Sequence, residues 1–234
     1  MRTSNWIRIL ATPGIWLLLG CLIAGVARGS PALNQKDTFQ DGTPQNWTNG
    51  VGAPDPLNIA TGGPAGAGDR YLQISSTGIG SAGSRPIIFN NGQWTGAYPA
   101  AAAAIEMDLR SFGSADLMIR IALRDTQFNQ FATADGSAFL LHNDGAWHHV
   151  SFGLTDASMA NLGFGNLASA LGSVGELRIL HSAFPSYTAD PIAANIGVDN
   201  ITLVAAPEPG AAGGALSMLG LMLGGRRLRH RPRH

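Results

Sequence analysis

The sequence predicts an all-β fold, an antiparallel β-sandwich of the jelly-roll type, for the residues between its two ends. Apolar and polar residues alternate with a period of two through most of residues 30–206, as in strands with one buried face. Clusters of Gly, Pro, Asn and Asp separate these stretches. Many short strands without helical crossovers favour two packed antiparallel sheets.

The clearest alternation runs from residue 105 to residue 124. Apolar residues at 105, 107 and 109 alternate with three charged ones, and a second alternating stretch, 117–124, follows a turn around Gly113. The other expected strands, in chain order, are 70–75, 85–90, 137–142, 147–154, 175–181 and 197–204. Only residues 156–171 suggest a helix, with Asp156 placed to cap its N-terminus, and glycines weaken that expectation.

The N-terminal segment, residues 1–29, has the pattern of a secretory signal helix. Two arginines precede an apolar run at 15–27, and Ala27 and Gly29 place small residues at the cleavage-specifying positions. The only cysteine, Cys21, lies in this run in a poor match to a lipidation motif, so lipidation is the alternative to ordinary cleavage. Ordinary cleavage leaves a mature chain without thiols or disulfides.

The C-terminal segment, residues 207–234, combines three features in a fixed order. An uncharged apolar stretch, 211–225, separates a Pro-Glu-Pro motif from an arginine cluster; the residues concerned are Pro207, Glu208, Pro209 and Arg226, Arg227, Arg229. This order resembles the PEP-CTERM sorting signal of bacterial surface proteins. The resemblance implies an exosortase, a membrane protease-transpeptidase, as the partner that cuts near Pro-Glu-Pro.

The physics of this tail agrees with the resemblance. Arginines are costly to move across a bilayer, so the cluster stops transfer and leaves the preceding body outside. As a helix, 211–225 would span about 22 Å against a hydrocarbon core of about 30 Å, which suits transient membrane insertion better than permanent anchoring. We therefore expect export by the secretion machinery across the inner membrane to the cell surface, outer envelope or extracellular matrix of a Gram-negative-type bacterium. A weak single-span anchor or a disordered basic tail is the alternative.

The body is acidic although the whole chain is formally neutral. Residues 30–206 hold seven Lys and Arg against fourteen Asp and Glu, a net charge of −7. Such a domain repels phosphates, so we expect no nucleic-acid binding. An acidic exported domain is also suited to binding calcium.

Three short landmarks are similar to those of galactose-binding-like jelly rolls, the fold of many carbohydrate-binding modules. They are Asp37-Thr38-Phe39-Gln40-Asp41-Gly42 with Trp47, then residues 147–154, then 198–203. The resemblance implies a structural calcium between the first and last strands, with Asp41 and Asp199 as ligands. Asp37 is a further candidate, although Gln40 stands where the family usually has an acidic residue. By strand parity Asp199 shares a face with Ile201 and Leu203, which also allows a carboxylate held by hydrogen bonds alone.

The aromatic residues divide into core and surface groups. Trp147 and Phe152 lie in an expected strand and are predicted to pack in the core. Trp94 and Tyr98 lie in a stretch of turn residues, where rings can stack on a saccharide beside Asn and Gln side chains. The alternative is that these two rings cover the end of the core.

The sequence gives little support to a catalytic site or a transition-metal site. His148 and His149 should point to opposite faces of a strand and so cannot share one ion. Glu106 and Asp108 share a strand face about 7 Å apart, a separation that a glycosidase can use, but the amphipathic strand favours two solvated charges on its outer face.

Three functions remain open from the sequence. The first is a noncatalytic surface or matrix protein with a carbohydrate-binding-like domain that engages exopolysaccharide. The second is a purely structural matrix component without a specific ligand. The third is a glycan-active enzyme that uses Glu106 and Asp108.

Overall fold

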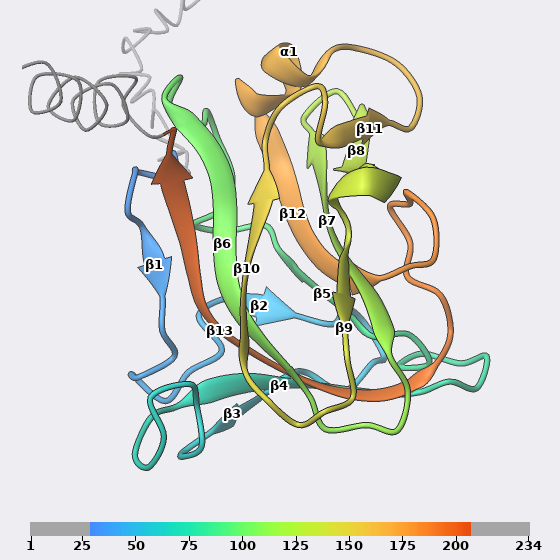
Figure 1. Ribbon diagram of the computed structural model, residues 1–234. Helices are drawn as coiled ribbons and strands as arrows, with labels where there is room; N and C mark the ends of the chain where they lie inside the picture. Colours follow the sequence, from blue (N-terminus) through green and yellow to red (C-terminus); the bar gives the residue numbers. More distant parts are fainter. Residues whose placement is uncertain (1–28, 207–234) are drawn as a thin grey trace, which may run out of the picture.

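The computed structural model describes residues 29–206 and folds them into two antiparallel β-sheets that pack as a sandwich (Figure 1). Sheet A comprises β1 (Lys36–Asp37), β3 (Leu57–Ile59), β4 (Tyr71–Thr77), β6 (Ala102–Ser111), β10 (His148–Gly153) and β13 (Ala193–Ala205). Sheet B comprises β2 (Trp47–Thr48), β5 (Ile87–Asn90), β7 (Leu117–Asp125), β8 (Gln130–Thr133), β9 (Phe139–Leu141), β11 (Met159–Asn161) and β12 (Val174–His181). The predicted antiparallel jelly-roll sandwich is confirmed.

The strand order places β13 at the centre of sheet A. This sheet runs β10-β6-β13-β4-β3, with β1 also paired to β13. Sheet B runs β11-β8-β7-β12-β5-β2, with β9 paired to β7. Because β13 pairs with β1, β4 and β6, its register fixes which residues of sheet A face the core.

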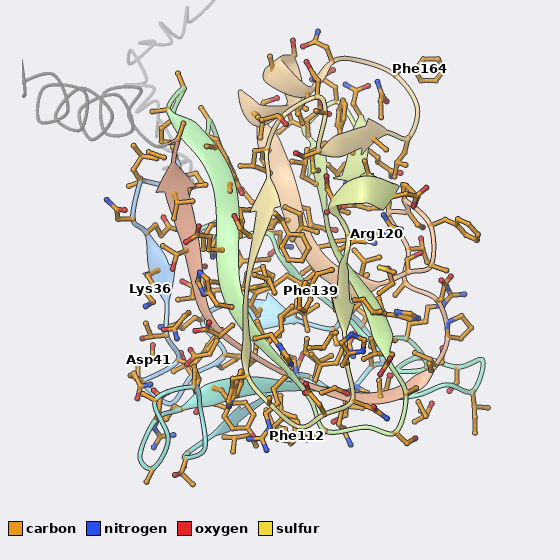
Figure 2. The ribbon with its side chains drawn as sticks, in the orientation of Figure 1. Lys36, Asp41, Phe112, Arg120, Phe139 and Phe164 are labelled. Atoms are coloured by element: carbon orange, nitrogen blue, oxygen red, sulfur yellow. The ribbon has the colours of Figure 1, made fainter. Side chains whose placement is uncertain are left out.

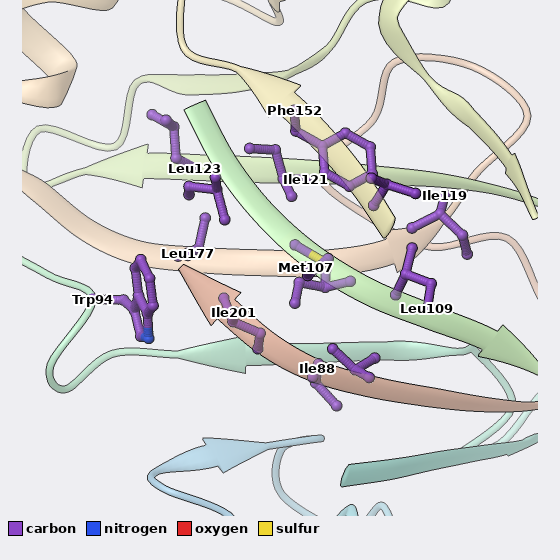
Figure 3. Packing of buried hydrophobic residues seen from close by; sticks show 14 of the residues in the cluster. Ile88, Trp94, Met107, Leu109, Ile119, Ile121, Leu123, Phe152, Leu177 and Ile201 are labelled. Atoms are coloured by element: carbon purple, nitrogen blue, oxygen red, sulfur yellow. The ribbon is translucent and has the colours of Figure 1, made fainter. Parts of the chain in front are cut away.

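The core lies between the sheets and follows the alternation seen in the sequence. On β6, Ile105, Met107 and Leu109 are fully buried, as are Ile121 and Leu123 on β7 (Figure 3). Burying each such side chain contributes about 1.5 to 3 kcal/mol. The charged residues between those of β6 face outward, as predicted.

The expected helix at 156–171 is wrong for most of its length. Residues Met159–Asn161 form strand β11, and the α-helix, α1, covers only Leu167–Leu171. Asn166 caps it, not Asp156: the Asn166 side chain accepts a hydrogen bond from the Ser169 amide. Besides α1, the described residues include a single 3₁₀ turn, Asp135–Ser137.

One buried carboxylate ties the N-terminal strands to the sandwich. Oδ2 of Asp37 accepts hydrogen bonds from Nε1 of Trp47 (2.8 Å), Nε1 of Trp94 (2.7 Å) and Nε2 of Gln93 (3.1 Å). Burial raises the pKa of Asp37, and the donated hydrogen bonds oppose that rise. Since Asp37 lies on β1 of sheet A and Trp47 on β2 of sheet B, this carboxylate joins the two sheets at one edge.

Replacing Asp37 by Ala should destabilise the domain strongly. Two buried indole N–H groups would lose their acceptor, which costs about 2 to 4 kcal/mol. For a domain of this size we expect the melting temperature to fall by roughly 5 to 15 °C in thermal unfolding followed by circular dichroism. The exposed Asp156→Ala is the matched control and should leave the melting temperature unchanged. Equal melting temperatures for the two variants would contradict the structural role of Asp37.

Candidate functional site

Three aromatic rings meet on the outer face of sheet A. Tyr71 begins β4, Phe112 follows β6 and Trp147 precedes β10. The Tyr71 ring stacks on Phe112 at a centroid distance of 5.7 Å and meets Trp147 edge-on at 5.3 Å. We call these three residues the aromatic cluster; Phe112 marks its place at the lower end of the molecule in Figure 2.

A glycine in β13 makes this meeting possible. Gly197 lies between Arg110 of β6 and Gln73 of β4 in the sheet. A Cβ atom at Gly197 would lie 2.7 Å from the Trp147 ring and 3.0 Å from the Phe112 ring. Both rings therefore lie directly on the backbone of the central strand, and a side chain at position 197 would force them to shift.

The three rings of the aromatic cluster differ in how far they are exposed to solvent. Tyr71 is only 6% exposed, whereas Phe112 is 38% exposed and Trp147 is partly exposed. Nε1 of Trp147 donates a 3.0 Å hydrogen bond to the carbonyl of Gly62, which fixes the orientation of the indole. Phe112 and Trp147 are thus the members that a ligand can reach.

Two polar groups beside the cluster are buried without a hydrogen-bond partner. Within residues 29–206 these are Nε of Arg110 and Oδ2 of Asp199. The Arg110 guanidinium lies 4.5 Å from the centroid of the Phe112 ring. Each unpaired buried group costs about 1 to 3 kcal/mol. Stability alone does not account for this pair, so the face is a functional candidate.

Asp199 faces outward because β13 contains a bulge. Asn200 has a left-handed backbone (φ 55°), and pairing with β6 skips from Asp199–Asp108 to Thr202–Glu106. The extra residue lets Val198 and Ile201 both face the core. The expected shared face of Asp199 with Ile201 and Leu203 is therefore wrong.

The environment of Asp199 favours its neutral form. Burial raises the pKa of Asp199 to about 7, and a 2.7 Å hydrogen bond from the Asn200 amide only partly opposes this. The negative charges of Asp69 and Asp108 contribute to this raised pKa.

A carboxylate pair lies next to these groups. Glu106 and Asp108 share the outer face, as predicted, and His149 reaches both: its Nδ1 is 2.9 Å from Oδ1 of Asp108 and its Nε2 is 3.6 Å from Oε2 of Glu106. Asn200 donates to Oδ2 of Asp108 at 2.6 Å. Both oxygens of Asp108 are thus engaged within the protein.

The expected calcium ligands are not brought together. Asp41 is exposed, and its oxygens accept hydrogen bonds from Thr43 and Gln45 in its own turn, of which the Thr43 amide does most to lower the Asp41 pKa. It borders a hollow of about 550 Å³ with Asp37, and Asp199 is not among the residues that line it. Among the described residues no three His, Cys, Asp or Glu side chains gather as a metal site. These contacts give no support to an ion held by Asp41 and Asp199. Calcium binding stays a prediction, which melting curves with and without a chelator can test.

Trp94 and Tyr98 are core residues, which corrects the expectation that they stack on a saccharide. Trp94 is fully buried in the core (Figure 3). Tyr98 is 7% exposed, and its hydroxyl donates a hydrogen bond to the Trp94 carbonyl. Burial also raises the Tyr98 pKa. The turn-rich segment folds over the end of the core, which is the alternative left open by the sequence.

Trp147 is the surface aromatic that sequence reasoning placed in the core. The alternation of residues along the strand could have indicated this. Val150 and Phe152 are buried, so the odd-numbered positions of this strand, including Trp147, face outward. Phe152 is a core residue, as predicted. His148 and His149 point to different partners, Asp144 and Asp108, which confirms their opposite orientation.

The sorting residues Pro207, Glu208, Pro209, Arg226, Arg227 and Arg229 lie outside the described residues, as does nearly all of the expected signal segment, 1–29. Among the residues that are described, no helix is both long and apolar enough to cross a membrane.

Comparisons with known proteins bear on the fold. No protein-family model and no curated protein matches the chain. An exo-β-agarase structure matches 75% of this chain with a TM-score of 0.55 and 13% identity, and another agarase matches 75% with a TM-score of 0.51 and 12% identity. A family 11 carbohydrate-binding module from Clostridium thermocellum, in complex with a mixed-linked tetrasaccharide, matches 76% of this chain and 99% of its own, with a TM-score of 0.48 and 15% identity. The chain spans about a quarter of each agarase (25% and 24%), and at these identities the likeness concerns the fold alone.

The protonation of Asp199 should shape the pH dependence of stability. Because its folded pKa, about 7, exceeds the unfolded value of 3.8, its contribution is fully present below about pH 4 and is lost as pH rises through 7. Ionisation then costs up to about 4 kcal/mol. Asp199→Asn should therefore unfold at higher denaturant than wild type at pH 8, with the difference vanishing near pH 4. Parallel pH profiles for the two proteins would contradict the buried state of Asp199.

Proposed function

We propose that the protein is an exported, noncatalytic β-sandwich that binds a neutral polysaccharide through the aromatic cluster. The observation that carries this proposal is the pair of accessible rings, Phe112 and Trp147, held flat on the strand at Gly197. Sugar rings present apolar C–H faces that stack on such rings. Polar side chains supply the hydroxyl partners around them.

The groups that flank the cluster argue for a neutral ligand. Asp108 and Glu106 lie on the same face, and the described body carries an excess of negative charge. The two carboxylates outnumber the one guanidinium beside the cluster, that of Arg110, so an anionic sugar would be repelled, whereas hydroxyl groups can donate to carboxylates.

The absence of catalysis is part of the proposal. Asp108 is engaged by His149 and Asn200, which leaves Glu106 without a free carboxylate partner for acid-base chemistry. If the purified domain released sugars from a polysaccharide, and Glu106→Gln abolished that release, the protein would be a glycan-active enzyme instead.

The two ends of the sequence support surface delivery. The signal pattern at 1–29 and the PEP-CTERM-like tail at 207–234 together suit export, exosortase processing and residence at the cell surface or in the matrix. Exopolysaccharide is the polymer that such a location makes available. A structural matrix component without a ligand is the alternative that binding measurements distinguish.

Trp147→Ala should weaken polysaccharide binding about five- to tenfold, because one stacked ring contributes on the order of 1 kcal/mol or more. Affinity electrophoresis of the purified body on a panel of neutral polysaccharides, including agarose, cellulose and mixed-linked glucan, measures this. Phe164→Ala, which removes an 86% exposed ring far from Phe112 in Figure 2, is the matched control and should bind as wild type.

Melting curves accompany these measurements, since Trp147 also packs on Tyr71. Phe112→Ala provides a second test if Trp147→Ala unfolds. Failure of the wild type to bind any panel member or the native exopolysaccharide would favour the purely structural alternative. Equal affinity of wild type, Trp147→Ala and Phe112→Ala would remove the site from this face.

The mature protein should lack both terminal segments. We expect cleavage near residue 29 and near Pro207, Glu208 and Pro209, so intact mass from the native host should correspond to a body of about residues 30–206. Deleting the exosortase should restore the C-terminal mass. A mature species that still ends at His234 in exosortase-positive cells would contradict the sorting proposal.

A further inference from the structure

The described chain begins and ends at the same end of the sandwich. The Ala206 amide donates a 3.3 Å hydrogen bond to the Ala101 carbonyl, and the Ala97 amide donates one of 3.3 Å to the Ser30 hydroxyl. Both contacts are made by the loop between β5 and β6. Figure 1 shows this end at the top, where β13 ends and β6 begins.

Further backbone hydrogen bonds join three more segments to this end. They run from Tyr98 to Leu171 (2.8 Å), from Thr126 to Ser173 (2.9 Å) and from Leu154 to Ala103 (2.8 Å). We call the surface that these segments form the terminal face; it comprises residues 29–34, 91–101, 126–129, 154–173 and 205–206.

The terminal face carries almost no charge. Of the seven basic and fourteen acidic residues in 30–206, only Asp156 belongs to it. Next to it, Asp125 is 4% exposed and its oxygens accept hydrogen bonds within its own turn, while Arg124 pairs with Glu176. The negative charge of the body therefore lies on the other surfaces, and the terminal face can approach a medium of low dielectric constant at the least cost.

Two phenyl rings are exposed on the terminal face. Phe164 is 86% exposed and Phe128 is 73% exposed, and Figure 2 shows Phe164 at the outer edge of this end. Their loops are in contact, since a Cβ atom at Gly165 would lie 2.9 Å from the Asn129 side chain. The exposed alanines add apolar surface: Ala97, Ala100, Ala101, Ala168 and Ala206. Apolar surface of this kind is typical of contacts with another protein or with a membrane.

The residues that follow the terminal face in the sequence favour a membrane. Residues 207–210 separate Ala206 from the uncharged apolar stretch 211–225. These four residues reach at most about 14 Å when fully extended. While 211–225 is inserted, the terminal face therefore lies within that distance of the lipid.

We propose that the terminal face docks on the lipid surface of the inner membrane for as long as the sorting tail is attached. This inference rests on the proposed export and sorting, and it adds a membrane contact made by the folded body. Phe164 and Phe128 enter the interfacial region, and the short connection to 211–225 keeps them at high effective concentration. The acidic surfaces face away from the lipid.

Docking has two consequences for the function. It holds the Pro-Glu-Pro motif at the membrane surface, where a membrane protease can reach it, and it leaves the aromatic cluster accessible, because Phe112 lies at the opposite end (Figure 2). Cleavage removes the tether, and two rings alone bind lipid weakly, so the mature body is released.

The test uses the full chain in phosphatidylcholine vesicles that contain a lipid with a nitroxide quencher. In a Cys21→Ser background, Ala168→Cys carries a fluorophore on the terminal face, and Ile79→Cys carries it at the other end of β13, beside Ala193. We expect strong quenching at 168 and none at 79. A third label, at Ser217→Cys, reports insertion of the tail.

Removal of either ring separates docking from mere proximity. Phe164→Ala and Phe128→Gly, the latter compatible with the left-handed backbone (φ 67°), should each lower the ratio of docked to undocked body about five- to tenfold. Phe184→Ala removes a ring that is also 73% exposed but lies outside the terminal face, and it should quench as wild type. Phe164→Ala should still bind polysaccharide.

Three results would overturn docking while leaving sorting and polysaccharide binding intact. They are quenching at 217 without quenching at 168, equal quenching at 168 and 79, and undiminished quenching at 168 in both ring variants. Quenching at 168 that requires added exosortase would assign the terminal face to a protein partner and so overturn lipid docking. If the label at 217 is not quenched either, the sorting proposal fails together with docking.

Discussion

The arrangement of sheet A depends on one extra residue in its central strand. Strand β13 is paired on both sides and cannot rotate, so its alternation fixes what faces the core. The left-handed Asn200 inserts one residue, which keeps Val198 and Ile201 inward and turns Gly197 and Asp199 outward. In a regular strand Ile201 would share its face with Gly197 and Asp199, so the core would contain a carboxylate and a position without a side chain. The bulge therefore determines both the packing between the sheets and the chemistry of the outer face.

Two buried aspartates differ in how fully the fold compensates their burial. Asp37 has three side-chain donors, two of them indoles, which compensate its burial and join the sheets. Asp199 has only one backbone donor and retains an unpaired oxygen among the described residues. Burial raises the pKa of both carboxyls, but only Asp199 lies on a face with accessible rings. Satisfied polar groups stabilise a fold, and unsatisfied ones at a surface mark a site that costs stability.

The sequence was sufficient for the fold and insufficient for the site, for identifiable reasons. Period-two alternation located the long strands, but two-residue strands such as β1 and β2 carry no periodicity. The bulge could not be foreseen because Asn200 lacks the usual glycine signal, so the parity of Asp199 was inverted. Trp94 was misplaced because a turn-rich segment was assumed to be exposed, although such a segment can fold inward when its indole finds a buried acceptor.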